Sequence, residues 1–578
     1  MPVKHYGIFL AYGPLVDLRF EGLGRHLAAF LRAAQENQDF HLTIACPKWM
    51  VKNLKELCVQ ENIDSKSFTL VTPPGTPVLL NALFGLRHGP NFLFRRARSL
   101  ASRLVARRAG APVAQPISAP STDVVLSDVN WMARIRHWWV FILLSLGLLP
   151  FVLTGAIITA ILGVALFPIF FIVVSVKQAR QRIHHLPLGR RIVYIQNRIP
   201  IILKKIPGIT RLRALISGCY RSVLATEIVM VAECANSVQN VSAWYCPAAF
   251  WPESSRIRAP RLICVPDIVT GEFPAGFALV TGEGFYESVC AIEKTVKTSH
   301  HFMTYSEAVK WGTLVARYHV KPEAVRIVRH APYALDQWIQ ITGLPDPVAA
   351  SRKYCEATLL TAIHQSQNAG YVAGFQNGAF KFIFYASQFR PNKNVLNLLR
   401  AYEYLLRRRH VQHKLILTGN PQDMQDINAY IQQHQLQNDV LCLHGLSAKE
   451  LAACYHLADL AVNPSLSEGG CPFTFTEALS VDTPVVMARI PVTLEVLTDP
   501  ALEASGTFFD PYEWKEMAAC IEAGLRNREN LLAVQMPVYK KLAERSWRDV
   551  VDEYVAALDA IAGAVARPDV PTAAGRAP

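Results

Sequence analysis

Acidic side chains are nearly absent from one long stretch of this 578-residue sequence. Between Arg87 and Ser222 there are 20 basic residues, and the only acids are Asp123 and Asp128, so the stretch carries +18. The rest of the chain has 39 basic and 43 acidic residues and is close to neutral. The net charge of +14 therefore belongs to one segment, and it is weak evidence for a nucleic-acid-binding protein.

The same segment contains 38 consecutive residues without a charged side chain, 138–175, which lie within the longest such run of the sequence. As one helix these 38 residues would extend about 57 Å, nearly twice the roughly 30 Å core of a bilayer. Basic residues at both ends favour a hairpin within 134–182 whose two ends lie on the cytoplasmic side. Pro150 and Pro168 fall inside the two halves, so a shallow re-entrant wedge stays open beside a spanning hairpin.

A second membrane contact is predicted at residues 92–108. A helix here would carry Phe94, Leu100 and Leu104 on one side and arginines on the other, which suits an anionic membrane surface. The alternative for this helix is a basic face that is simply exposed to solvent. The alternative for the apolar run is a pair of buried core helices, but such helices should carry a polar face and the run shows none. Nucleic-acid binding is disfavoured because the basic segment lacks interleaved aromatics of the stacking type.

The sequence also has no CxxC pair among its 12 cysteines. This absence argues against a zinc or disulfide framework and indicates reduced, mostly buried thiols of a cytosolic protein. The apolar run near the N-terminus is too short for a signal peptide and fits a first β-strand. An apolar content of 51% excludes disorder as the main state, and the length predicts two or more domains.

Outside the basic segment, short apolar strands alternate with helical patterns. The strands expected in the first unit are 4–13, 40–47, 67–74, 241–247, 261–269 and 300–306. Those expected in the second unit are 381–388, 413–419, 440–445, 460–465 and 484–489. This alternation predicts an α/β protein with two Rossmann-like, doubly wound parallel sheets, which bind ligands at the carboxyl ends of their strands.

The predicted organisation has five parts. They are the first part of an N-terminal domain (1–86), the basic insertion (87–222), the rest of that domain (223–340), a C-terminal domain (341–565), and a disordered tail (566–578). Two such domains create a cleft between them, the usual place for an enzyme with two substrates.

The loop from Pro464 to Phe473 joins a strand to a helix and contains Gly469 and Gly470. Glycines let the backbone approach a ligand, and the N–H groups of a helix N-terminus attract a diphosphate. Glu477, one turn into the helix, can face ribose hydroxyls, and Glu468 can reach a sugar. On residue types alone, a capped helix with solvated acids explains the pattern equally well.

Three segments, 385–406, 440–465 and 463–486, carry a resemblance to a known family. They resemble the retaining glycosyltransferases of family 4, which have the two-domain GT-B fold. The resemblance is clear over roughly 380–550 and weaker in the N-terminal half. It implies a metal-independent hexosyltransferase that uses a nucleotide-diphosphate sugar, needs no cofactor, and acts on a glycan or lipid-linked acceptor. It also implies that the N-terminal domain binds the acceptor and that the C-terminal domain binds the nucleotide sugar and ends in a crossing helix.

The resemblance also implies roles for individual residues. Lys393 and Arg390 would neutralise the leaving diphosphate, and Glu468 would orient the donor sugar or stabilise charge on its ring. The donor-binding positions would be Glu477, Gly469, Gly470, Cys471 and Ser387. The acceptor side would be Gly22, Gly24 and Asp267. No residue is nominated as a metal ligand.

Three departures from the family pattern stand out. Eight residues separate Glu468 from Glu477 where seven are usual, no histidine precedes Asp267, and Gln388 stands where an arginine is common. These departures leave two alternatives open: an inactive GT-B-like scaffold of a polysaccharide synthesis or export complex, and a nucleotide-sugar epimerase. The preferred prediction is a retaining glycosyltransferase of polysaccharide or glycolipid biosynthesis at the cytoplasmic face of the inner membrane.

Overall fold

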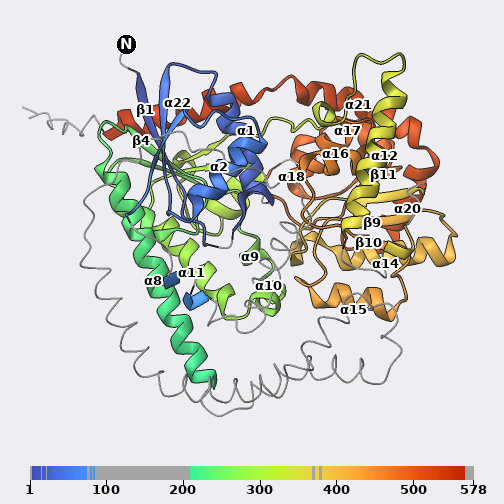
Figure 1. The fold of residues 1–578 in the computed structure, drawn as a ribbon, viewed down its shortest axis with the longest axis horizontal. Helices are drawn as coiled ribbons and strands as arrows, with labels where there is room; N and C mark the ends of the chain where they lie inside the picture. Colours follow the sequence, from blue (N-terminus) through green and yellow to red (C-terminus); the bar gives the residue numbers. More distant parts are fainter. Residues whose placement is uncertain are drawn as a thin grey trace, which may run out of the picture.

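The computed structural model shows two α/β domains side by side (Figure 1). It describes residues 3–14, 16–20, 22–74, 79–80, 82–84, 209–366, 372–375, 380–470 and 472–565. The predicted membrane elements 92–108 and 138–175 and the tail 566–578 lie outside the described residues.

The first domain is built on a sheet of seven parallel strands in the order β3-β2-β1-β4-β5-β6-β7. The strands are β1 (Lys4–Phe9), β2 (Phe40–Ala45), β3 (Phe68–Val71), β4 (Ala243–Cys246), β5 (Arg261–Cys264), β6 (His301–Thr304) and β7 (Val325–Ile327). The strands are apolar on both faces because helices cover both sides of a parallel sheet.

Helices surround this sheet. They are η1 (Leu18–Phe20), α1 (Gly22–Ala34), α2 (Met50–Gln60), α8 (Ile209–Ser237), η3 (Pro252–Arg256), α9 (Val269–Glu272), α10 (Pro274–Thr281), α11 (Glu283–Lys297), the π-helix η4 (Val309–Val315) and η5 (Pro322–Ala324). The next short helix, η6 (Asp336–Trp338), packs on α16 (Ala448–Leu457) of the second domain. In α1 the buried side chains Leu27, Phe30, Leu31 and Ala34 follow the helical period, so one stripe faces the core.

Helix α8 is longer than the sequence patterns indicate. It runs without a break across the expected domain limit at 222/223. Its later turns bury Ile228, Val231, Ala232 and Ala235 in the first core. In the part of the chain that the structure describes, it is the one helix long and apolar enough to cross a membrane, judged by length and composition, over Ala214–Ser237. One third of its most apolar window is buried inside the protein.

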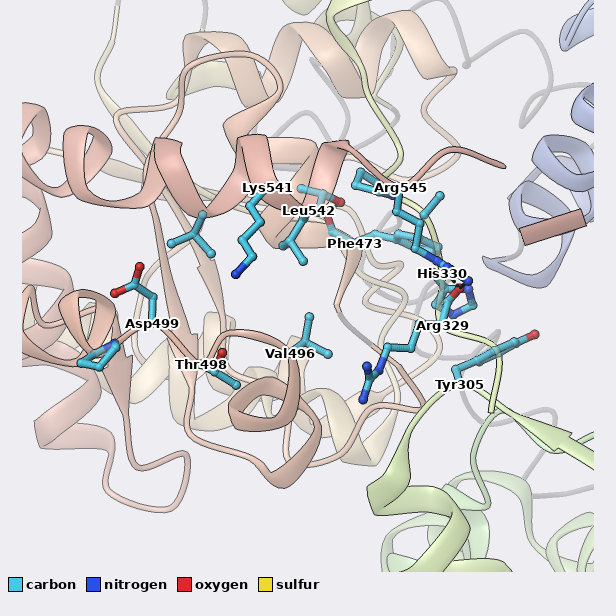
Figure 2. A pocket seen from close by; sticks show the side chains of 15 residues that line it. Tyr305, Arg329, His330, Phe473, Val496, Thr498, Asp499, Lys541, Leu542 and Arg545 are labelled. Carbon is cyan, nitrogen blue, oxygen red and sulfur yellow. Dashed lines mark hydrogen bonds between the residues drawn. The ribbon is translucent and has the colours of Figure 1, made fainter. Parts of the chain in front are cut away.

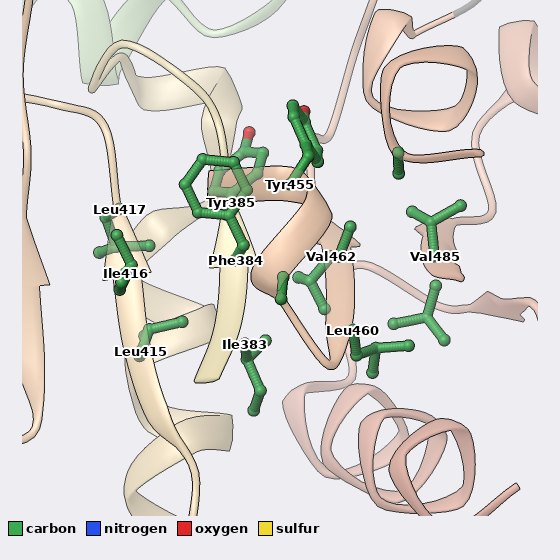
Figure 3. Packing of buried hydrophobic residues seen from close by; sticks show 14 of the residues in the cluster. Ile383, Phe384, Tyr385, Leu415, Ile416, Leu417, Tyr455, Leu460, Val462 and Val485 are labelled. Carbon is green, nitrogen blue, oxygen red and sulfur yellow. The ribbon is translucent and has the colours of Figure 1, made fainter. Parts of the chain in front are cut away.

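The second domain has six parallel strands in the order β10-β9-β8-β11-β12-β13. They are β8 (Phe382–Tyr385), β9 (Lys414–Leu417), β10 (Val440–Cys442), β11 (Leu460–Asn463), β12 (Val485–Ala488) and β13 (Phe508–Phe509). Figure 3 shows how apolar side chains of the neighbouring strands, such as Ile383, Ile416 and Val462, pack in one core. The two sheets confirm the predicted doubly wound α/β architecture.

The helices of the second domain end in a return to the first. They are α12 (Pro347–Gln365), η7 (Pro391–Lys393), α14 (Val395–Arg408), α15 (Gln425–Gln433), α16 (Ala448–Leu457), α17 (Phe473–Leu479), α18 (Pro491–Val496), α19 (Pro500–Ala504), α20 (Trp514–Arg526), α21 (Arg528–Ala543) and α22 (Trp547–Val565). Figure 1 shows α22 crossing to the first domain, where Val550, Tyr554 and Leu558 join the core. The predicted crossing helix is therefore present.

The described cysteines are free thiols, and most of them are buried. Burial raises the pKa of Cys46, Cys246 and Cys264 to about 12 in each case, so these thiols stay protonated at neutral pH. The prediction of mostly buried, reduced cysteines is confirmed for this part of the chain.

Candidate active site

Two loops of the second domain are fastened together at the carboxyl ends of β8 and β11. The Leu466 amide donates to the Asn392 carbonyl at 2.8 Å, and the Asn392 side-chain amide donates to the Ser467 carbonyl at 3.1 Å. Asn394 adopts a left-handed conformation (φ 55°) and its amide donates to the Pro464 carbonyl at 3.1 Å. These bonds place the end of η7 directly beside the loop that precedes α17.

The fastened loops bring Lys393 against Glu468. The Lys393 Nζ lies 2.5 Å from the Glu468 Oε1, and both side chains are mostly buried, with 19% and 17% of their surface exposed. Burial alone lowers the pKa of Lys393, but the Glu468 carboxylate more than offsets this, so the pKa lies above its usual value. The site thus holds a fixed cation at the carboxyl end of the sheet.

Asp267 belongs to the same cluster although it comes from the first domain. It follows β5, in the segment that leads into α9. Burial raises its pKa to about 6, the cations of Lys393 and Arg390 lower it, and Glu468 raises it. The structure therefore brings four of the predicted residues, Asp267, Arg390, Lys393 and Glu468, within electrostatic reach of one another.

Gly469 and Gly470 lie tightly against the first domain. A Cβ on Gly469 would lie 2.1 Å from the Pro266 carbonyl oxygen, and one on Gly470 would lie 2.9 Å from both Tyr305 and His330. The Ser306 hydroxyl of the first domain donates to the Gly469 carbonyl at 2.9 Å. Only glycine at these positions allows the backbones to meet in this way.

Glu477 lies apart from the lysine cluster and is 2% exposed. Its Oε1 accepts a hydrogen bond from the Arg25 Nη1 at 2.5 Å, and this pair joins α17 to α1 of the first domain. Burial alone lowers the pKa of Arg25, and the charge of Glu477 more than offsets this, so the pKa is raised. Each of the two predicted glutamates is thus paired with its own cation.

The remaining predicted residues occupy varied positions. Arg390 is exposed and its guanidinium donates to the Gln388 side chain at 2.9 Å, so these two neighbours of Lys393 contact each other. The Ser387 amide, at the end of β8, donates to the Thr418 hydroxyl at 2.8 Å. Cys471 lies outside the described residues.

The two N-terminal glycines have different surroundings. A Cβ on Gly24 would lie 1.8 Å from the Leu18 carbonyl oxygen, so packing of α1 on η1 already requires a glycine there. At Gly22, the first residue of α1, nothing lies within 4 Å of such a Cβ.

Sequence reasoning missed Arg25 and Ser306. Arg25 lies in the first turn of α1, the helix that follows β1, and Ser306 comes directly after β6. Both positions are on the side of a doubly wound sheet where the carboxyl ends of the strands bind ligands. That position was the available signal, but the partners Glu477 and Gly469 lie 452 and 163 residues away in the chain.

The described residues include no group of three or more His, Cys, Asp or Glu side chains arranged to hold a metal ion. The cluster instead offers two cations, Lys393 and Arg390, beside two carboxylates in a partly buried setting. Such cations attract an anionic group and stabilise negative charge that develops on it during a reaction. The chemistry that suits this arrangement is transfer of a group away from a phosphate or diphosphate.

No curated protein sequence matches this chain. Among solved structures it is similar to HepE of Anabaena in complex with UDP-glucose, with 16% identity and a TM-score of 0.42 over 59% of this chain and 82% of that one. It is also similar to the sucrose-phosphate synthase of Thermosynechococcus elongatus, with 15% identity and a TM-score of 0.44 over 59% and 79% of the two chains. Residues 374–540, which hold Lys393, Glu468 and Glu477, match the family model of the glycosyl transferases group 1.

Proposed function

We propose that the protein is a membrane-associated glycosyltransferase that moves a sugar, with retention, from a nucleotide-diphosphate donor to a glycan or lipid-linked acceptor. The observation that carries this proposal is the cluster of Lys393, Arg390, Glu468 and Asp267 where the two domains meet. It lies at the carboxyl ends of strands from both sheets, and its second-domain residues fall within the segment that matches the glycosyl transferases group 1.

The proposed mechanism uses the charges of the cluster. Lys393 and Arg390 bind the diphosphate and stabilise the negative charge that grows on it as the bond to the sugar breaks. Glu468, already held beside Lys393, orients the sugar or stabilises positive charge on its ring. Glu477 binds the ribose once its pairing with Arg25 is exchanged for the donor. Because fixed cations neutralise the leaving group, the mechanism does not call for a metal or other cofactor.

The membrane part of the proposal is supported by the sequence of residues 87–222, which combines a charge of +18 with the uncharged run 138–175. Helix α8 begins inside this segment, at Ile209, and includes the apolar window Ala214–Ser237. Held at the cytoplasmic face of the membrane, the active site meets a lipid-borne acceptor at a raised effective concentration.

The test is transfer or hydrolysis by the purified full chain in detergent, assayed against a panel of nucleotide sugars as release of the nucleoside diphosphate. We expect one donor to be consumed, and Lys393→Ala to lower the rate by about 10²–10³-fold because a fixed charge is lost from the transition state. Lys449→Ala, an exposed lysine of α16, is the matched control and should behave as wild type. Wild-type rates for Lys393→Ala would overturn the site assignment.

A further inference from the structure

A cavity of about 560 Å³ lies between α21 and the loops around α17 to α19, at the hinge between the domains (Figure 2). We call it the hinge cavity; the residues that matter in its wall are Arg329, His330, Phe473, Asp499, Lys541 and Arg545. The active-site residues Lys393, Glu468 and Glu477 do not line it. Its volume falls within the range of sites for small molecules.

The wall of the hinge cavity carries more positive than negative charge. Arg329 pairs with Glu495 at 3.1 Å but leaves 53% of its side chain exposed. Arg545 pairs with Glu553 at 2.7 Å and donates to the Arg329 carbonyl at 3.0 Å, so the two arginines are held next to each other. Lys541 extends from α21 toward the cavity in Figure 2, and no carboxylate within the described ranges forms an ion pair with it.

The other groups that line the cavity suit a polar ligand that has one apolar face. Phe473, Val496 and Leu542 offer apolar contacts, while Asp499 lies at the opposite end of the cavity from Arg329 and His330 in Figure 2. The His330 Nδ1 is buried and has no hydrogen-bond partner among the described residues. A buried polar atom of this kind is costly unless something satisfies it.

We propose that the hinge cavity binds a monosaccharide phosphate. The phosphoryl group would lie among Arg329, Lys541 and Arg545, and the sugar would pack on Phe473 with its hydroxyls toward Asp499. Cations in a wall of this kind recognise a phosphate through charge-assisted hydrogen bonds, and an aromatic ring packs on the apolar face of a sugar.

Occupancy of the hinge cavity is linked to the arrangement of the domains. Arg329 and His330 belong to the first domain, Phe473 and Asp499 to the second, and Lys541 to α21, which precedes the crossing helix. A ligand that contacts all three favours the arrangement seen here over a more open one. Thr476, also in the wall, is the chain neighbour of Glu477, so the ligand would bias the donor site through α17.

The experiment is calorimetric titration of the full chain in detergent, with glucose 6-phosphate as the probe and inorganic phosphate and glucose in separate arms. We expect saturable binding of glucose 6-phosphate, weaker binding of phosphate and none of glucose. Lys541→Ala should lower the affinity for glucose 6-phosphate about tenfold, because one charge-assisted contact is lost. Lys540→Ala removes the adjacent exposed lysine, which does not line the cavity, and should leave the affinity unchanged.

The donor site also attracts phosphate esters, so the titration is repeated with Lys393→Ala. Retained binding in that variant, together with the loss in Lys541→Ala, supports the hinge cavity. Absence of saturable binding, equal affinities in Lys541→Ala and Lys540→Ala, or loss in Lys393→Ala alone would overturn the proposal. Equal affinities for glucose 6-phosphate and inorganic phosphate would overturn the contact to the sugar.

Discussion

The two domains have the same architecture but arrange their polar site residues differently. In the second domain, Lys393 and Glu468 lie in two loops that Asn392 and Asn394 fasten together, so this half of the site is assembled within one domain. In the first domain, Arg25, Asp267 and Ser306 follow three different strands and contact the site from separate directions. The comparison indicates that the second-domain half of the proposed site is preformed, whereas the other half is completed when the domains meet.

Several contacts between the domains are polar, which makes them accessible to mutation. Arg25 pairs with Glu477, Ser306 bonds to Gly469, and the amides of Glu307 and Ala308 donate to the Glu495 carboxylate at 2.9 and 3.0 Å. Domain interfaces of this kind favour relative motion of the two halves. Variants on each side should therefore distinguish residues that bind the donor from residues that only hold the two domains together.

Among variants at the contacts between the domains, the largest effect is expected at Glu477, on the preformed side. Glu477→Gln should weaken donor binding by about 10–100-fold, since a charge-assisted bond to the ligand contributes about 1.5–3 kcal/mol. Arg25→Gln, on the other partner, should change donor affinity much less because it acts only through closure. Calorimetric titration of both variants with the donor identified above measures the difference. Equal losses of donor affinity in the two variants would contradict the view that only the second domain binds the donor directly.

The next effect concerns the tight contact of Gly469 with the first domain. Gly469→Ala places a Cβ where only 2.1 Å separates it from the Pro266 carbonyl, so the domains must move apart. We expect transfer to fall about tenfold, since small displacements of reacting groups are costly, and the radius of gyration to rise in small-angle scattering. Gly563→Ala is the matched control, because nothing lies within 4 Å of its Cβ on α22. An unchanged rate and size for Gly469→Ala would contradict the proposed closure.

A pH effect is expected from Asp267. Its folded-state pKa is raised by burial to about 6, above the ordinary value of 3.8. A raised carboxyl pKa means that the native state holds the proton more tightly than the unfolded chain, so this contribution to stability is full below about pH 4 and is lost as the pH rises to 6. Relative to Asp267→Asn, the wild type should therefore lose free energy of unfolding over that interval. The free energy of unfolding of both proteins is measured by denaturant titration at pH 4 and pH 6. The same difference between wild type and Asp267→Asn at both pH values would contradict the assignment.

The smallest effect is expected at Ser306. Its hydroxyl donates to Gly469 and accepts from the Val309 amide at 3.2 Å, so Ser306→Ala removes two hydrogen bonds. The free energy of unfolding should fall by about 1–2 kcal/mol, measured by denaturant titration. Ser67→Ala, which removes one exposed bond to the Asp64 carbonyl, is a control that should cost less. An equal cost for both would show that the contact between the domains contributes nothing.

Sequence patterns predicted the strands of both sheets well, because buried parallel strands are short, apolar and bounded by turn residues. They did not predict β7 or β13, which have three and two residues, or the full length of α8, whose early turns lie in the basic segment. Lys393 and Glu468 follow the neighbouring strands β8 and β11, which explains their proximity, and their contact with one ligand stays a prediction. The pairing of Glu477 with Arg25 depends on how the domains are oriented, which no local pattern encodes.

The most direct test of the central claim is equilibrium binding of nucleoside diphosphates to the full chain, measured by calorimetry for UDP, GDP and ADP. We predict that at least one of them binds saturably and that Lys393→Ala weakens it by more than about tenfold, while Lys449→Ala leaves it unchanged. Absence of saturable binding for all three would contradict the account and favour a scaffold that has lost its donor site.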